Sequence, residues 1–272
     1  MQEQGNDMSP SSFAYADSSR DRGRLPVCHT VVIIPAYNEE GAIGALLDEV
    51  RQHVPDLDVI VINDGSTDGT ALLAGKKGVK VLDLPCNLGV GGAVQAGFRY
   101  AYDQGYRYVV RIDGDGQHPP AEIPKLIAAM ANARGDADLV IGSRFAGEQS
   151  YVSTLVRFLG IKMLALFLSR ICRSRVTDPT SGFWIVNRKL LFYFAHDYPT
   201  EYPEPEAIAL LRRHGFSFKE EPVKFRPRTV GFSSIGVWGT VYYMMKVGLA
   251  LVVDRIRPID SHFAKENLGH IL

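Results

Sequence analysis

The chain has 272 residues, 46% of them hydrophobic, and its 30 Lys and Arg residues balance its 30 Asp and Glu residues. This length and composition suit one α/β core with appendages, and zero net charge argues against a nucleic-acid partner, because binding a phosphate backbone needs a basic excess. The cysteines, Cys28, Cys86 and Cys172, are odd in number and widely spaced, which favours free thiols in a reducing compartment over disulfides or a zinc site.

Residues 1–26 are rich in Ser, Asp, Gly, Arg and Gln and contain no apolar run of the kind that a signal peptide carries. Segments of this composition bury too little apolar surface to fold. We therefore expect residues 1–26 to form a disordered tail, and we expect the protein to remain in the cytosol.

Two apolar runs, at residues 30–35 and 58–63, predict the first two strands. Because neither run alternates with polar residues, both strands are expected to be buried on both faces of a parallel sheet. Each run ends in a polar loop, and a helix is predicted after the first loop, near residues 42–50. In the second loop, Ser66 or Thr67 is expected to cap the next helix.

The most informative stretch is the next apolar strand, residues 108–112, which runs directly into Asp113 and Asp115. Side chains alternate along an extended segment, so the two carboxylates are expected to share one face. The glycines beside them, Gly114 and Gly116, leave room for a ligand. Two close carboxylates suit Mg²⁺ or Mn²⁺, although the same residues, taken alone, also fit a solvated turn.

Polar residues follow all three strands at the same end. Ligands of open α/β sheets bind beyond the carboxyl ends of the strands, so we expect these polar residues to converge on one crevice. The alternative is three unrelated loops. The residues concerned are Tyr37, Glu39, Asp64, Asp113 and Asp115.

Two further apolar segments, residues 152–176 and 235–253, carry basic or aromatic side chains. Neither is a comfortable transmembrane span, because cations break the first and the second only reaches the lower limit of about 17–20 residues. Each could pack against the core or lie as an interfacial helix on an anionic bilayer. In the second segment, Trp238, Tyr242 and Tyr243 would suit the headgroup zone.

The strand ends and loops carry a series of short motifs in a fixed order, among them Asp-Gly-Asp-Gly-Gln-His-Pro and Thr-Ser-Gly-Phe. The motifs cover residues 34–39, 63–70, 87–93, 113–119, 142–144, 180–183 and 228–233. In order and spacing they resemble family 2 glycosyltransferases, and most closely the dolichyl- or polyprenyl-phosphate sugar synthases. The resemblance implies an α/β fold of the GT-A (Rossmann-like) type for residues 27–234, with a mostly parallel sheet flanked by helices, and amphipathic helices in residues 235–272.

The resemblance also implies a nucleotide-diphosphate sugar donor and Mg²⁺ or Mn²⁺ as cofactor. It assigns the cation to Asp113 and Asp115, with Gln117 as a candidate further ligand. The other residues that it places against the donor or the acceptor are Pro35, Tyr37, Glu39, Asp64, Asn87, Gly89, Asp178, Ser181 and Ser233.

Two arginines of the motifs, Arg144 and Arg228, suit phosphate, because guanidinium offers a planar fork of donors. Either could instead form a surface ion pair. The chain departs from several polyprenyl-phosphate synthases at Trp184, where they carry Arg directly after Ser-Gly-Phe. That charge is either missing here or supplied by Arg226, Arg228 or the cations of residues 157–175.

The acceptor decides the role of Glu204 and Glu206. A hydroxyl acceptor needs a general base, whereas a phosphate is already an anion at neutral pH. For a saccharide acceptor, either glutamate would be the base. For a lipid phosphate, Glu206 would only orient groups, and Glu204 could equally complement a helix macrodipole.

Together these features predict an inverting, metal-dependent glycosyltransferase that moves a hexose from a donor of the UDP-glucose or GDP-mannose type to polyprenyl phosphate. The protein would lie peripherally on the inner, cytoplasmic face of the membrane, where residues 235–257 could bind a separate membrane protein or form a homodimer. The alternatives are transfer to a saccharide hydroxyl and a non-catalytic nucleotide-sugar-binding subunit of a membrane complex. The residues expected to act in catalysis are Asp115, Glu204, Glu206 and Arg228.

Overall fold

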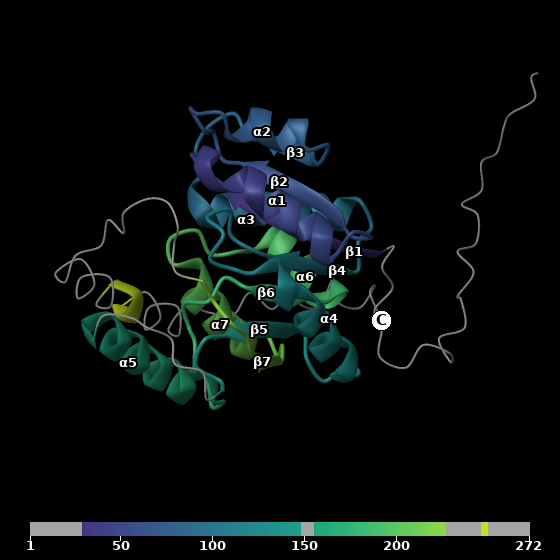
Figure 1. Cartoon of the computed structure of the whole chain (residues 1–272). Helices are drawn as coiled ribbons and strands as arrows, with labels where there is room; N and C mark the ends of the chain where they lie inside the picture. The colour runs from purple at the N-terminus through teal and green to yellow at the C-terminus, as the bar shows by residue number, and fades with distance from the viewer. Residues whose placement is uncertain (1–28, 148–154, 227–245, 250–272) are drawn as a thin grey trace, which may run out of the picture.

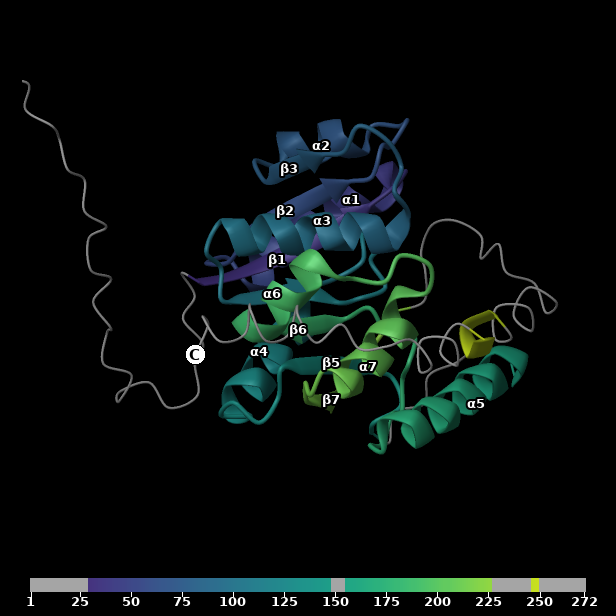
Figure 2. The same cartoon turned by 180° about the vertical axis from the view of Figure 1, so that it is seen from behind.

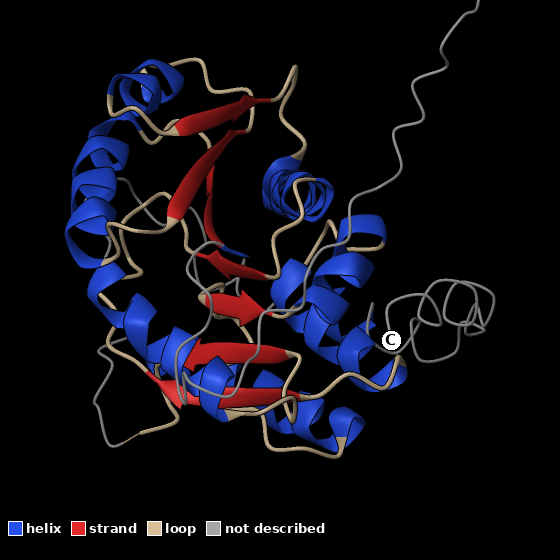
Figure 3. Cartoon of the chain, turned by 90° about the vertical axis from the view of Figure 1, so that its right-hand side faces the viewer, coloured by secondary structure: helices blue, strands red, loops and turns tan. Residues whose placement is uncertain are grey.

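The computed structural model describes residues 29–147, 155–226 and 246–249. In this part of the chain, seven strands form one sheet in the order β3-β2-β1-β4-β6-β5-β7, and helices cover both of its faces (Figure 1, Figure 3). The expected disordered tail, Arg228, Ser233 and most of residues 235–272 lie outside the described residues.

The elements alternate between strands and helices along most of the chain, as expected for an α/β fold. In order they are β1 (Thr30–Ala36), α1 (Glu40–His53), β2 (Asp58–Asn63), α2 (Thr70–Lys76), β3 (Lys80–Asp83), α3 (Gly89–Asp103), β4 (Tyr108–Arg111), the 3₁₀ turn η2 (Pro120–Glu122), α4 (Ile123–Asn132), β5 (Leu139–Ser143), α5 (Leu155–Cys172), β6 (Trp184–Val186), α6 (Arg188–His196), α7 (Pro203–Arg213) and β7 (Phe218–Pro222).

The sheet is mostly parallel, as predicted. β1 pairs in parallel with β2 and β4, β2 pairs in parallel with β3, and β5 pairs in parallel with β7. Only β6, among the described strands, runs antiparallel to its neighbours, β4 and β5. The carboxyl ends of β1, β2 and β4 therefore meet at one edge of the sheet.

The core explains why the first strands are continuously apolar. All seven residues of β1 are buried. Val31 and Ile33 face one core cluster with side chains of α3, α6 and α7, and Val32 and Ile34 face another with side chains of α1 and α4. Figure 2 shows α3 and α6 in front of the sheet, and Figure 1 shows α1 and α4 on the other side. With helices on both faces, neither set of alternating residues meets water.

The start of α2 differs from the prediction that Ser66 or Thr67 caps it. The helix begins at Thr70, and its N-cap residue, Gly69, makes no side-chain cap. The Oγ of Ser66 instead accepts the backbone N–H of Asn38 at 3.0 Å, and the Oδ1 of Asn38 accepts the backbone N–H of Thr67 at 2.8 Å. These bonds join the loops that follow β1 and β2.

α5 has one buried and one exposed face. Leu164 and Leu168 are buried in the core, whereas Met163 and Leu166 are each 63% exposed. In Figures 1 and 2 the helix lies at the opposite end of the molecule from α2. Among the described helices, none is both long and apolar enough to cross a bilayer.

Gly91→Ala is expected to destabilise the fold by about 1–3 kcal/mol. A Cβ at Gly91, in α3, would lie 2.5 Å from the Cα of Thr200 and 2.6 Å from the carbonyl oxygen of Pro199, so backbone must move. The melting temperature should fall by about 2–4 °C for each kcal/mol in a domain of this size. Thermal unfolding followed by circular dichroism measures the change.

Gly75→Ala is the matched control. Gly75 lies in α2, and a Cβ there would meet nothing within 4 Å. Alanine is the better helix former by about 1 kcal/mol, so this variant should be as stable as the wild type or more stable. Equal melting temperatures for the two variants would contradict the proposed clash.

Candidate functional site

A pocket of about 460 Å³ opens where β1, β2 and β4 end. It brings together eight of the residues predicted from the sequence, so the predicted convergence is confirmed and the alternative of three unrelated loops is wrong. The roles of these residues stay predictions. They are Pro35, Tyr37, Glu39, Asp64, Asn87, Gly89, Asp113 and Asp115.

One side of the pocket is held together by Asp64. This residue is 3% exposed, and its Oδ1 accepts the backbone N–H of Leu88 at 2.7 Å. The Oδ1 of Asn87 accepts the backbone N–H of Gly89 at 2.9 Å. The loop after β2 is thereby tied to the first turn of α3. Tyr37, in contrast, is 47% exposed, so its ring is accessible to a flat ligand.

Asp113 and Asp115 line the pocket, but an extended strand does not carry them both. β4 ends at Arg111, and Asp115 lies in a turn. The prediction of one extended segment is therefore wrong, although both carboxylates reach the same pocket. A Cβ at Gly114 would lie 3.0 Å from the carbonyl oxygen of Pro35. Glycine thus allows the turn to lie against the end of β1.

Gln117 closes this turn on Asp115. The backbone N–H of Gln117 donates to Oδ1 of Asp115 at 3.0 Å, and its Nε2 donates to Oδ2 at 2.5 Å. The structure therefore places the Gln117 amide directly beside the carboxylate with which it was predicted to share a cation. Whether it is a ligand stays a prediction.

His118 holds the backbone of Asp113, a role that the sequence prediction does not assign. The histidine is 3% exposed and stacks on Phe183 at 5.1 Å between ring centroids. Burial lowers the pKa of His118, in keeping with a neutral ring whose Nδ1 accepts the N–H of Asp113 at 2.9 Å. The Gln-His-Pro motif was the available signal for this contact.

Arg111 is a buried cation beside the carboxylates, and the sequence prediction also missed it. Its side chain is 1% exposed. Its Nη2 donates to Oδ1 of Asp113 at 3.2 Å and to Oε1 of Glu204 at 2.6 Å, and its Nη1 donates to the hydroxyl of Tyr198 at 3.2 Å. A lone cation in the apolar run of β4 was the sequence signal.

The charges of this cluster stabilise one another. Burial raises the pKa of Asp113, but the charge of Arg111 and its hydrogen bond to the carboxylate outweigh burial, so this pKa lies below its ordinary value. Burial lowers the pKa of Arg111, but Tyr198, Asp113 and Glu204 outweigh it and raise this pKa above its ordinary value. Asp113 and Arg111 are therefore both charged at neutral pH.

Arg144 forms a buried ion pair and not the surface pair considered from the sequence. It is 6% exposed, and its Nε and Nη2 donate to the fully buried Asp178 at 2.7 and 2.6 Å. Asp178 in turn donates its N–H to Glu220 at 3.0 Å. The Oγ of Ser181 donates to the carbonyl of Gly142 at 2.6 Å. Arg144, Asp178 and Ser181 do not belong to the pocket lining.

The two predicted glutamates lie in the first turn of α7. The side chain of Glu204 is 16% exposed and is bound by Arg111 at 2.6 Å. The backbone N–H of Glu206 donates to the carbonyl of Tyr202 at 3.1 Å. Neither glutamate belongs to the pocket lining, so their predicted catalytic roles stay untested.

Trp184 occupies the position where several of the resembling synthases carry Arg. It is fully buried in β6 and lies directly opposite Arg111 of β4 in the strand register. Of the cations considered as substitutes, Arg226 pairs with Glu49 at 2.8 Å, and Arg228 lies outside the described residues. A described guanidinium next to this position is that of Arg111, centred 5.5 Å from the Trp184 ring.

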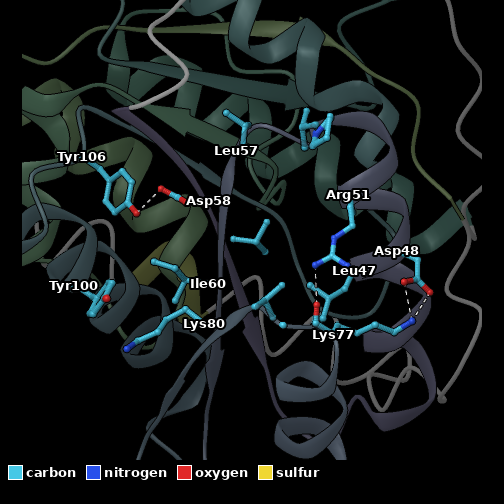
Figure 4. A pocket seen from close by; sticks show the side chains of 15 residues that line it. Leu47, Asp48, Arg51, Leu57, Asp58, Ile60, Lys77, Lys80, Tyr100 and Tyr106 are labelled. Carbon is cyan, nitrogen blue, oxygen red and sulfur yellow. Dashed lines mark hydrogen bonds and ion pairs between the residues drawn. The ribbon is translucent and has the colours of Figure 1, made fainter.

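A second pocket, of about 310 Å³, lies at the amino ends of β2 and β3 (Figure 4). Several of its polar groups bond to one another. Lys77 pairs with Asp48 at 2.6 Å, Arg51 donates to the carbonyl of Lys77, and the hydroxyl of Tyr106 donates to Asp58 at 2.8 Å. No predicted site residue lines this second pocket, whereas eight of them line the pocket at the carboxyl ends of the strands.

Within the described ranges, no group of three or more His, Cys, Asp or Glu side chains is arranged to hold a metal ion.

Sequence comparisons identify a protein family and several relatives that are similar to this chain. The family model described as glycosyl transferase family 2 matches residues 31–192. The polyprenol monophosphomannose synthase of Mycolicibacterium smegmatis is 30% identical over 247 residues, which cover 86% of this chain and 92% of that protein. The undecaprenyl-phosphate mannosyltransferase of Micrococcus luteus is 41% identical over 119 residues, which cover 42% of this chain and 47% of that protein.

Solved structures match the fold. The glucosyl-3-phosphoglycerate synthase of Mycobacterium tuberculosis, crystallised with Mn²⁺, UDP and glucosyl-3-phosphoglycerate, superposes with a TM-score of 0.64 at 23% identity. The match covers 86% of this chain and 80% of that structure. The predicted GT-A arrangement, a mostly parallel sheet flanked by helices, is confirmed.

Proposed function

Because the chain belongs to glycosyl transferase family 2, and is thus a glycosyltransferase, we propose that it transfers a hexose from a nucleoside-diphosphate sugar to a polyprenyl phosphate. The observation that carries the proposal is the pocket at the strand ends, which gathers an exposed aromatic ring and several carboxylates. Two relatives are named for mannose, so mannose is the hexose that we propose first.

The nucleoside would bind beside the loops after β1 and β2. Tyr37 offers an exposed ring for a base to stack on, and Glu39 and Asp64 would accept hydrogen bonds from the ribose and the base. These loops are bonded to each other through Asn38 and Ser66, so the nucleoside would meet a site whose shape is already set.

The residues at the end of β4 fit a divalent cation. Asp113 and Asp115 supply hard oxygen donors in one pocket, and Mg²⁺ sites usually use one or two carboxylates with phosphate oxygens and water. Gln117 fits after a half-turn of its amide, which would bring Oε1 to the position that Nε2 now occupies beside Asp115. A bound cation would screen the charge that grows on the departing diphosphate.

The acceptor step is proposed as a single displacement with inversion. An oxygen of the acceptor phosphate attacks the anomeric carbon as the bond to the diphosphate breaks. A phosphate is already an anion, so its attacking oxygen must be oriented and its charge screened, but it needs no general base. The bond between Glu204 and Arg111 at 2.6 Å supports this acceptor over a hydroxyl, because a carboxylate held by a buried guanidinium is a poor base. We propose Arg228 as the cation that meets the acceptor phosphate.

A product assay tests the proposal. Purified protein with Mg²⁺ or Mn²⁺ is incubated with radiolabelled UDP- and GDP-sugars and with undecaprenyl or dolichyl phosphate. Label should enter the organic phase with one donor and should require both the metal and the lipid phosphate. Donor turnover that labels only a water-soluble saccharide would overturn the proposed acceptor.

We also propose that α5 rests on the surface of the membrane that holds the acceptor, on its cytoplasmic face. The exposed face of α5 carries Leu159, Met163 and Leu166, which are 59–63% exposed. Exposed cations lie within and just after the helix, including Lys162 and Arg170, and residues 155–176 contain no Asp or Glu. An apolar stripe flanked by basic residues suits an anionic bilayer.

Leu166→Gln is expected to weaken binding to anionic liposomes about fivefold, because roughly 1 kcal/mol of apolar burial is lost. Leu72→Gln is the matched control, since Leu72 is also 63% exposed but belongs to α2, at the opposite end of the molecule. Liposome co-sedimentation measures both. Equal binding by the two variants would contradict the proposed role of α5.

A further inference from the structure

A buried cation at the end of β4 joins the two carboxylate-bearing parts of the site. Arg111 is 1% exposed and donates to Asp113, which follows β4, and to Glu204, which begins α7. The two carboxylates are 91 residues apart in the chain but share one nitrogen, Nη2. Arg111 is thus the link between the pocket and α7.

The surroundings of Arg111 leave it little freedom. The guanidinium lies over the ring of Trp184, its neighbour across the strand pair, at 5.5 Å from the centroid. A Cβ at Gly182 would lie 2.8 Å from Nη2 of Arg111 and 3.2 Å from Oδ1 of Asp113. The absence of a side chain at Gly182 therefore makes the space that the ion pair fills. The other terminal nitrogen of the guanidinium, Nη1, donates a hydrogen bond to the hydroxyl of Tyr198.

The contacts of Asp113 differ between its two oxygens. Oδ1 is bonded to Arg111, while Oδ2 has the Nε2 of His118 at 3.8 Å, too far for a hydrogen bond. The backbone N–H of Asp113 is bonded to the same histidine. With its backbone and one oxygen fixed, Asp113 has a defined orientation at the pocket.

We propose that Arg111 is a positioning residue for the divalent cation: its guanidinium fixes the Asp113 carboxylate and anchors it to Glu204 of α7. The inference rests on the proposed function, in which Asp113 holds that cation. It also gives Glu204 a role other than general base, as the counter-charge that holds Arg111 in place.

The test measures Mn²⁺ affinity in the presence of UDP, from the electron paramagnetic resonance signal of free Mn²⁺. Arg111→Met should weaken Mn²⁺ binding about tenfold or more, the usual cost of removing a group that orients a metal ligand. Arg111→Lys should recover part of the Mn²⁺ affinity, because lysine restores the positive charge but not the planar set of guanidinium donors. If Arg111 acted only through its charge, its removal would reduce repulsion of the metal, so unchanged or tighter Mn²⁺ binding would overturn the inference.

Arg188→Met is the matched control. Arg188 also donates to fixed acceptors, the carbonyls of Tyr102 and Tyr106, and stacks on the ring of Tyr102 at 4.1 Å, and neither tyrosine is a predicted site residue. It should lower the melting temperature and leave Mn²⁺ affinity unchanged. An equal loss of affinity in this control would overturn the inference by showing a general structural effect.

Glu204→Gln keeps the inference testable if Arg111→Met does not fold. Glutamine can still accept the bond from Arg111 but lacks the charge, so Mn²⁺ affinity should fall less than in Arg111→Met. Wild-type affinity in both Glu204→Gln and Arg111→Lys would overturn the inference.

Asp113→Asn distinguishes failure of the proposed metal site from failure of the role of Arg111. If Asp113→Asn leaves Mn²⁺ affinity intact, the proposed metal site is wrong. If Asp113→Asn weakens Mn²⁺ binding but the Arg111 variants do not, only the positioning role of Arg111 is wrong.

Discussion

Asp115→Asn is expected to lower kcat/KM for hexose transfer by about 10²–10³-fold while the protein stays folded. Asp115 lines the pocket, and its loss of charge removes a hard donor from the proposed cation site. Its present bonds are to the backbone N–H and the side-chain amide of Gln117, and an asparagine oxygen can accept either one. The turn should therefore survive. Steady-state kinetics of label transfer to lipid, with melting temperatures alongside, measures the effect.

Asp103→Asn is the matched control for this change. Asp103 ends α3, its side chain is 49% exposed, and it pairs with Arg99 at 3.0 Å. Such exposed pairs contribute little to stability, so neither the fold nor kcat/KM should change.

Removal of the metal gives a second test of the cation site. Chelation of the metal should inactivate the wild type, and added Mn²⁺ should restore the activity of the wild type but not that of Asp115→Asn. Full activity in Asp115→Asn would contradict the proposed cation site.

The convergence of the pocket was predictable from the sequence because it depends on backbone topology. Apolar runs without alternation predict parallel strands buried on both faces, and such strands end at one edge of the sheet. Tyr37, Asp64 and Asp113 each follow such a run within two residues. Their common pocket therefore follows from strand direction alone, without knowledge of side-chain contacts.

The partners of the buried charges were not predictable in the same way. Arg144 suited a phosphate by its chemistry, yet Asp178, 34 residues later, takes its guanidinium in a bidentate pair. Glu204 suited a general base, yet Arg111, 93 residues earlier, binds it. Pairs this far apart in the chain depend on how the strands are ordered, and periodicity carries no information about that order.

The second half of the sheet was harder to predict for a related reason. β6 has only three residues, yet it lies between β4 and β5 and runs antiparallel to both. A run this short has no usable period. Its position nevertheless decides that Trp184 faces Arg111 across the strands, and thus that the Thr-Ser-Gly-Phe motif lies against the cluster that holds Asp113.

Replacing polyprenyl phosphate by polyprenol is expected to lower the transfer rate by at least about 10²-fold, the smallest usual contribution of a general base. The phosphate brings its own anionic nucleophile, whereas the alcohol must lose a proton to a base. Of the two glutamates in the first turn of α7, Glu204 is held by Arg111. Initial rates with the two lipids, matched in chain length and dispersed in the same detergent, measure the ratio.

Glu204→Gln and Glu206→Gln decide between the acceptors when each is assayed with both lipids. If the acceptor is a phosphate, Glu206→Gln should leave most of the activity, and Glu204→Gln should act mainly through the metal, so added Mn²⁺ should recover part of its rate. If a hydroxyl is the true acceptor, one of the two variants should lose about 10²–10⁴-fold whatever the metal concentration. Saturating Mn²⁺ thus separates a carboxylate that positions Arg111 from one that removes a proton, because only the first acts through the affinity of the site for the cation.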